Sequence, residues 1–153
     1  MDDPFDLVVP AGHPLASADA VDLAAAAGEP WIGADRGHDS AIVLAACSAA
    51  GFAPRIAHGA EGWNGVVALV SHGFGVCLMP RLTPVPAHHD VVRIPLRPAP
   101  SRAVLTCVRR GSSAQPAIAR GLAALAEVGR QSPLPLVDGE HDGTRPHRHT
   151  YRA

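Results

Sequence analysis

Apolar positions along the chain alternate between two spacings. Short continuous apolar runs, typical of buried strands, are followed by segments in which apolar residues recur every three or four positions, as on one face of a helix. The strand-like runs cover residues 5–9, 31–33, 54–58, 76–79, 91–96 and 102–109. The helical spacings cover residues 21–26, about 40–50, 62–72 and about 114–128. This alternation predicts an α/β protein with a largely parallel sheet.

The clearest unit is the stretch from Leu69 to Pro80, with the sequence LVSHGFGVCLMP. An apolar helix runs into Gly73, and a glycine just after a helix can adopt the left-handed conformation that ends it. An apolar strand follows and stops at Pro80, because proline cannot donate a hydrogen bond to a sheet ladder. The stretch therefore predicts the helix and the second strand of a strand–helix–strand crossover.

Polar residues mark where two other helices begin. Asp19 is placed to cap the short helix of residues 21–26, and Gly28 ends that helix. Asp39 or Ser40 is placed to cap the next helix, which ends at Gly51. The predicted apolar faces are Ile42, Ala45, Ala46 and Ala49, then Trp63, Val66, Val67 and Val70, and finally Ile118, Leu122 and Leu125.

Two strand-to-helix turns, residues 33–40 and 59–64, follow strands of the predicted sheet. In open α/β sheets, ligands bind at the carboxyl ends of the strands. Free N–H groups at the following helix N-termini favour an anionic group such as a carboxylate. We therefore expect a binding site at these two turns.

The charge of the chain is nearly balanced but unevenly distributed. The formal net charge of −1 argues against general affinity for nucleic acid, which needs a basic surface. Residues 1–35 carry seven acidic side chains and no arginine, whereas residues 81–130 carry eight arginines and two acidic side chains. We interpret this difference as two differently solvated faces, with a subunit or partner surface as the alternative.

The three cysteines, Cys47, Cys77 and Cys107, each lie within an apolar helix or strand pattern. Buried free thiols are therefore expected, in place of disulfides or metal ligands. The sequence shows no basic-then-apolar leader pattern and no apolar run of about 18 residues. We expect a soluble, cytoplasmic protein that does not contact a membrane.

Several motifs, in their order and spacing, resemble the effector-binding domain of LysR-type transcriptional regulators. They are the runs PAGHPLA at 10–16, VDL at 21–23, PWI at 30–32, AGFAP at 50–54 and LVSHGFGVCLMP at 69–80. Residues 102–110 and the helix after them resemble the end of that domain, so the likeness covers residues 5–128.

The resemblance implies a type 2 periplasmic-binding-protein fold, in which two α/β subdomains joined by two crossover strands enclose a small-molecule cleft. Residues 20–90 match a complete second subdomain, and residues 5–10 and 98–110 match the crossover strands. The first subdomain is incomplete, and the helix-turn-helix of the family has no counterpart, so we expect an N-terminally truncated member without its own DNA contact. Residues 131–153, rich in Pro, His and Arg, are expected to form a disordered tail.

In the family, effector contacts come partly from the two strand-to-helix turns. By position, this places the candidate effector-binding residues at Asp35, Arg36, His38, Ser40, Glu61, Trp63 and Asn64. Other roles remain open for them. Trp63 shares the apolar stripe of its helix and can belong to the core, whereas Ser40, Glu61 and Asn64 can cap helices.

No catalytic or metal site is expected. His38, Asp39 and Ser40 are adjacent, but catalytic triads are assembled by the fold and adjacent residues on one turn rarely have the required geometry. No Gly-x-Ser-x-Gly motif is present. His88 and His89, with the histidines of the tail, could bind a transition metal, but a tail offers no fixed geometry. Neither a cofactor nor an enzymatic activity is predicted.

The function implied is sensing of a small-molecule effector, such as a carboxylate, within a LysR-type regulator that controls transcription when intact. The alternatives are a stand-alone partner of a full-length regulator and a non-functional gene fragment. The apolar stripe of the helix at 114–128 should lack the strands on which it would pack. We therefore expect weak local stability at residues 100–128, or assembly into a homo-oligomer or with a partner regulator through that face.

Overall fold

A computed structural model of the chain describes residues 1–34 and 38–131. The expected tail, apart from the backbone of Gln131, lies outside the described residues, as do Asp35 and Arg36. The strands are β1 (Asp2–Pro10), β2 (Pro30–Ala34), β3 (Arg55–Ala60), β4 (Cys77–Pro80), β5 (Val91–Pro95) and β6 (Ser101–Ala103). The helices are α1 (His38–Ala49), α2 (Gly62–Ser71) and α3 (Pro116–Gln131), with short 3-10 helices η1 (Pro14–Ser17) and η2 (Leu23–Ala26).

Strand β1 lies in the middle of the sheet and is antiparallel to both of its neighbours. It pairs antiparallel with β4 on one side and with β5 on the other. Strand β2 pairs parallel with β3, and its other edge meets the chain just before β4, where the Ile32 amide donates to the Val76 carbonyl at 2.9 Å. The strand order is therefore β3-β2-β4-β1-β5. Strands β2 and β3 pair in parallel, and a parallel bridge joins β2 to the chain before β4, whereas β1 is antiparallel to β4, β5 and β6. The predicted largely parallel sheet is therefore wrong for the part of the sheet built around β1.

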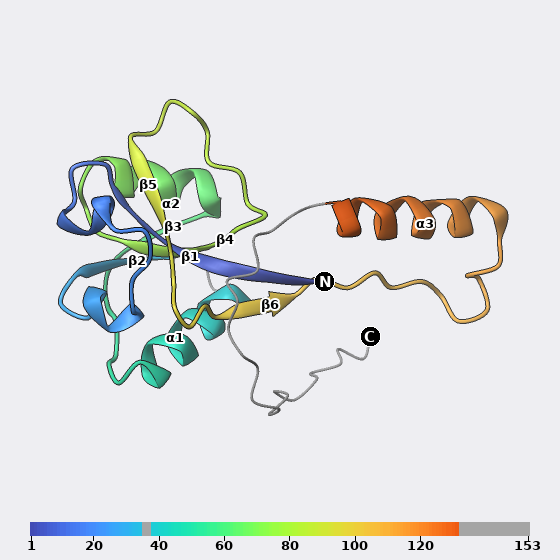
Figure 1. The fold of residues 1–153 in the computed structure, drawn as a ribbon, viewed down its shortest axis with the longest axis horizontal. Coiled ribbons are helices and arrows are strands. Elements are labelled where there is room, and N and C mark those ends of the chain that lie inside the picture. The colour runs from blue at the N-terminus through green and yellow to red at the C-terminus, as the bar shows by residue number, and fades with distance from the viewer. Residues whose placement is uncertain (35–37, 132–153) are drawn as a thin grey trace.

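Helices α1 and α2 cover opposite faces of this sheet (Figure 1). Alternate residues of β1 point to the two sides: Phe5, Leu7 and Val9 belong to the core beneath α1, and Val8 belongs to the core beneath α2. Buried valines of α2 complete the second core, as their spacing predicts: Val66, Val67 and Val70. The strand alternation and the helical stripe thus build two apolar layers around one sheet.

The glycines of the Leu69–Pro80 stretch act as predicted and also reveal a close packing contact. Gly73, which follows the C-cap residue His72 of α2, has a φ of +77°, so the expected left-handed helix end is confirmed. A Cβ on Gly75 would lie 2.3 Å from the carbonyl oxygen of Pro30. Only glycine therefore lets the chain pass this close to β2.

The predicted starts of two helices are wrong. Helix α1 begins at His38, so Asp39 and Ser40 lie in its first turn and neither is the residue before the helix. The first short helix is capped by Asp22, whose carboxylate accepts a hydrogen bond from the Ala24 amide at 2.8 Å, and not by Asp19. In both cases several polar residues near the start compete for the cap, and local sequence does not rank them.

The inward face of α1 also differs from the predicted stripe. Ile42 and Ala46 pack against the core as expected, but Val43 and Cys47 replace Ala45 and Ala49, which are exposed. In an alanine-rich helix the small residues do not define one apolar face, so the larger neighbours decide which way the helix turns.

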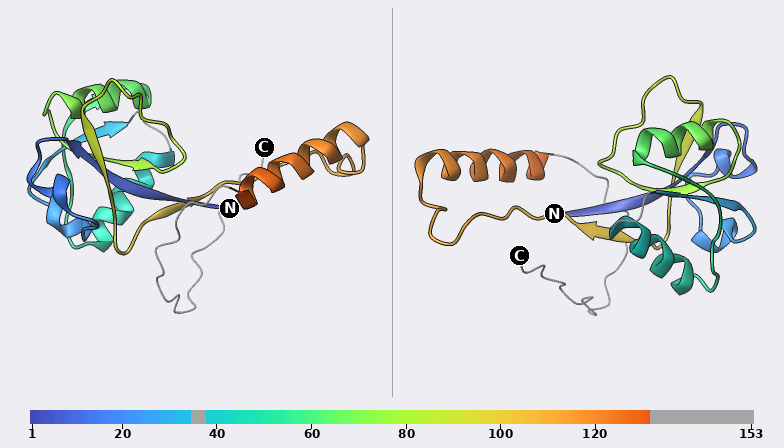
Figure 2. Two further views of the ribbon diagram at one scale, coloured as in Figure 1. Left: turned by 45° about the horizontal axis from the view of Figure 1, so that its top comes forward. Right: turned by 180° about the vertical axis from the view of Figure 1, so that it is seen from behind.

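Residues 101–131 project from the body of the molecule. The start of β1 pairs with β6 in a ribbon that leaves the sheet, and the chain then continues into α3 (Figures 1 and 2). The predicted strand 102–109 is wrong beyond Ala103, because among the described residues only Met1 pairs with the following segment, through Val104. Leu105 is 75% exposed and Cys107 is exposed, which corrects the expectation that all three thiols are buried.

None of the described helices is both long and apolar enough to cross a membrane.

Candidate functional site

Two helices begin at one edge of the sheet. Ala34 at the end of β2 pairs with Ala60 at the end of β3, and α1 and α2 begin shortly after these two residues. The first turn of α2 packs closely on the end of β3, since a Cβ on Gly65 would lie 3.1 Å from the Cβ of Ala60. Both helix N-termini therefore lie at the carboxyl edge of the parallel strands, as the sequence predicts.

A hollow of about 140 Å³ opens at this edge. Its walls come from β2, β3, β4 and both helices, and most of the lining side chains are apolar. The lining residues are Ile32, Gly33, Ser40, Val43, Leu44, Ile56, Trp63 and Leu78. Leu44 and Ile56 are each about half exposed, which leaves apolar surface accessible at the hollow.

Two of the predicted effector-binding residues, Ser40 and Trp63, line this hollow from α1 and α2. Trp63 is half-buried and also packs against the core beneath α2, which confirms its predicted place in the core, and its role in effector binding stays a prediction. The side chain of His38, like Asp35 and Arg36, lies outside the described residues.

Glu61 and Asn64 lie at the start of α2 but do not line the hollow. Both are exposed, and Glu61 occupies the N-cap position without a side-chain hydrogen bond to the helix. Capping by Glu61, one of its two predicted roles, is therefore wrong, because an aspartate-length side chain reaches the second or third amide more readily. The first-turn amides of α2 receive no capping bond from Glu61.

The buried cysteines are structural. Burial raises the pKa of Cys47 to about 11 and that of Cys77 to about 12, so both stay protonated and unreactive near neutral pH. His72 follows α2, and its Nδ1 lies 2.8 Å from the Ala68 carbonyl oxygen, a contact that ties the imidazole to the last turn of the helix. Among the described residues, no group of three His, Cys, Asp or Glu side chains could hold a metal ion.

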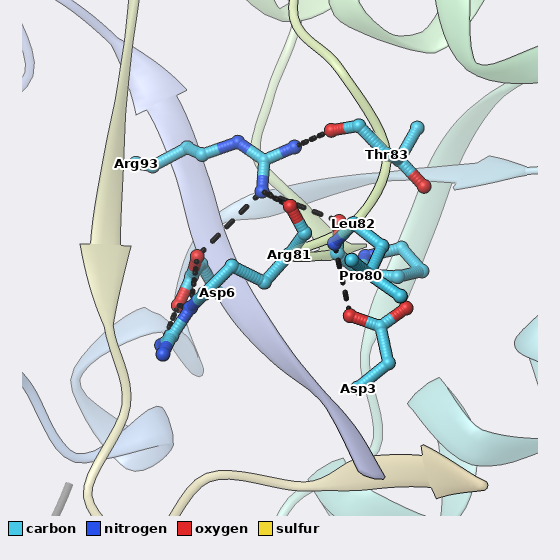
Figure 3. Close-up of polar contacts among 7 residues, drawn as sticks. All are labelled: Asp3, Asp6, Pro80, Arg81, Leu82, Thr83 and Arg93. Atoms are coloured by element: carbon cyan, nitrogen blue, oxygen red, sulfur yellow. Dashed lines mark hydrogen bonds and ion pairs between the residues drawn. The ribbon is translucent and has the colours of Figure 1, made fainter. Parts of the chain in front are cut away.

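A buried ion-pair network lies at the same edge of the sheet, where β4 and β5 end (Figure 3). Asp6 is 3% exposed, and the Arg81 Nε donates to its two carboxylate oxygens at 3.2 and 3.1 Å. Arg93 approaches the same carboxylate at 3.6 Å and also donates to the carbonyls of Pro80 and Thr83. The hydrogen bond from Arg81 to Asp6 raises the pKa of Arg81, whereas burial lowers that of Arg93.

Asp3 extends this network to the projecting ribbon. Its carboxylate, fully buried, accepts from the Leu82 amide at 2.9 Å and from Arg102 Nε at 3.0 Å. Part of the uneven charge along the sequence is therefore an internal set of ion pairs, and the interpretation as two solvated faces is wrong for these residues. The acidic residues inside an apolar strand pattern could have indicated these internal ion pairs from the sequence, because an isolated buried charge is costly.

The comparisons with known proteins bear on this arrangement. A family model described as the LysR substrate binding domain matches residues 1–130. The chain belongs to the LysR substrate-binding domain family. Its structure is similar to HinK, a LysR family transcriptional regulator from Pseudomonas aeruginosa, at 23% identity and a TM-score of 0.63, over 68% of this chain and 37% of that one.

Two effector-bound structures are similar as well. The effector-binding domain of QuiR, in complex with shikimate, has a TM-score of 0.60 at 20% identity, over 81% of this chain and 63% of that one. The regulatory domain of CcmR from Synechocystis PCC6803, in complex with 2-PG, has a TM-score of 0.66 at 14% identity, over 86% of this chain and 65% of that one. A search of curated proteins found no match.

The fold is the type 2 periplasmic-binding-protein-like α/β fold of these LysR domains, in partial form. This chain spans between 37% and 65% of the three structures.

Proposed function

We propose that this chain is the small-molecule effector-sensing part of a LysR-type regulator, and that the effector binds at the hollow beside Ser40 and Trp63. The observation that carries the proposal is the position of this hollow, at the edge where two parallel strands end and two helices begin. Backbone amides at those helix starts favour an anionic end on the ligand, such as a carboxylate. The shikimate and 2-PG complexes of similar domains support the same class of ligand.

In the intact cytoplasmic regulator, the effector would control transcription by shifting an equilibrium between two arrangements of the protein. It can do so only by binding one arrangement more tightly than the other. The proposal assigns no catalytic step, cofactor, metal or membrane contact to this chain, and DNA contact is assigned to a separate helix-turn-helix element.

Thermal-shift measurements with a panel of small aromatic and aliphatic carboxylates test the proposal. At least one carboxylate should raise the Tm of the wild type. Ser40→Trp, which fills the hollow from α1, should abolish that shift. Ser48→Trp is the matched control, because Ser48 is an exposed serine at the other end of the same helix.

Circular dichroism should show both variants folded before the comparison is made. If Ser40→Trp does not fold, Trp63→Ala replaces it as the variant at the hollow. The absence of a Tm shift with every carboxylate in the panel would overturn the proposal, as would equal shifts in all variants.

A second candidate function is a stand-alone interaction partner of a full-length regulator or of a second copy, through residues 100–128. The observation that favours it is the exposure of Leu105 and Leu125 on the projecting segment. Light scattering coupled to size exclusion should then show a dimer, or co-purification should capture a LysR-type regulator. A clean monomer without such a partner would contradict this candidate.

A further inference from the structure

We propose that the hollow takes the apolar part of the effector, and that this part is a single six-membered carbon ring without hydroxyl groups. This inference rests on the proposed effector-sensing function and narrows its ligand class. It concerns which ring the site accepts, and it leaves the acidic end of the ligand to the neighbouring helix starts.

The size of the hollow is the first argument. Its volume is about 140 Å³. A cavity of about 150 Å³ lined by aliphatic and aromatic side chains takes up benzene. A six-membered ring therefore fills this hollow, whereas a fused two-ring system would extend into solvent.

The chemistry of the walls is the second argument. Val43 and Leu44 on α1 and Ile56 on β3 present only carbon atoms to a ligand. A hydroxyl group placed against them exchanges water for a surface without hydrogen-bond partners, which costs binding free energy. Such walls disfavour a ring that carries several hydroxyl groups, such as the shikimate held by QuiR.

Trp63 supplies the part of the wall that α2 contributes. The indole is half-buried and held by the core beneath α2, so its position is largely set before a ligand arrives. Offset or edge-to-face contact with an indole favours an aromatic ring over a saturated ring of the same size. Benzoate is therefore the simplest probe, and cyclohexanecarboxylate tests the aromatic preference.

A pair of glycines in the strands gives a matched test. Gly33 of β2 lines the hollow and lies opposite Gly59 of β3 in the parallel ladder. A Cβ on Gly33 would lie 3.4 Å from Ile56 Cγ2, which is ordinary contact with another wall residue, whereas a Cβ on Gly59 would meet nothing within 4 Å. Neither glycine has a positive φ, so both positions accept a side chain.

Isothermal titration of the full chain with benzoate, cyclohexanecarboxylate and shikimate provides the experiment. Benzoate should bind the wild type and Gly59→Val with equal Kd. Gly33→Val should weaken benzoate binding by about tenfold or more, the range for added carbon in a filled apolar pocket. Shikimate should bind the wild type at least about tenfold more weakly than benzoate, because its hydroxyl groups would lose partners.

Gly33→Ala and Gly59→Ala repeat the comparison with a smaller side chain if a valine variant does not fold. Two failures can be told apart. If a carboxylate from the wider panel binds but shikimate equals benzoate, or Gly33→Val binds benzoate as the wild type does, the ring assignment is wrong and the sensing proposal stands. If no carboxylate binds, the sensing proposal and the ring assignment are both wrong.

Discussion

Helices α2 and α3 are both amphipathic, yet within residues 1–34 and 38–131 α2 alone of the two buries its apolar face. Val66, Val67 and Val70 of α2 are fully buried against the sheet. On α3, the predicted stripe leaves Ile118 and Leu122 only half-buried, and Leu125 is 58% exposed. The same helical spacing of apolar residues is thus buried in a core on α2 and largely exposed on α3.

This difference teaches that periodicity identifies an apolar face but not what covers it. A strand pattern behaves in the same way. The run 5–9 becomes the central strand of the sheet, whereas residues 104–109 form no strand among the described residues. In each case the second segment has the spacing of a buried element without neighbouring strands to bury it.

Hydrogen exchange should show the largest difference between the two helices. Amides of α2 should be protected to nearly the global free energy of unfolding, about 5–15 kcal/mol, whereas those of α3 should exchange almost as in a free peptide. A helix of this length is marginal without tertiary packing. Measurements at several protein concentrations separate the intrinsic stability of α3 from association.

Protection of α3 that rises with concentration would favour self-association through its apolar face. Equal protection of α2 and α3 in a monomer would break the comparison altogether.

The second largest difference between the body and α3 should be the loss of stability when an ion pair is removed. Asp6→Ala should lower the free energy of unfolding by about 3–5 kcal/mol, because it leaves the half-buried Arg81 and Arg93 without their buried carboxylate. Glu127→Ala removes the exposed partner of Arg130 on α3 and should change stability by no more than about 1 kcal/mol. Urea denaturation of both variants measures the contrast.

Similar losses in the two variants would show that the Asp6 network contributes no more than a surface ion pair. Asp6→Asn keeps the side-chain volume and should be nearly as destabilising as Asp6→Ala if charge pairing is the cause.

The smallest effects are expected from one substitution made in two places. Gly73→Ala should cost roughly 1–2 kcal/mol, because the φ of +77° after α2 is strained for alanine. Gly121→Ala lies inside α3 with open space around its Cβ and should stabilise that helix by about 1 kcal/mol. Circular dichroism should show added helicity for Gly121→Ala, while the urea midpoint of the body stays unchanged. A shift of that midpoint would mean that α3 is coupled to the body.

Much of the fold could be predicted because its signals are local. The order of most helices and strands, the helix ends at Gly51 and Gly73, and the position of the two carboxyl-edge turns beside the hollow all follow from spacing and from glycine conformation. Ser40 and Trp63, which line the hollow, could be placed at these turns for the same reason. Val43, Leu44 and Ile56 could not, because they join the hollow from segments far apart along the chain.

The sequence by itself determined the α/β class, the family and the glycine-ended crossover unit, since these depend on residue types at fixed spacings. The direction of β1, the pairing of Asp3 and Asp6 with distant arginines, and the shape of the hollow were decided only by the tertiary structure. The physical reason is the same for all three. Strand direction, charge pairing and cavity shape arise between segments, and no single segment carries the identity of its neighbour.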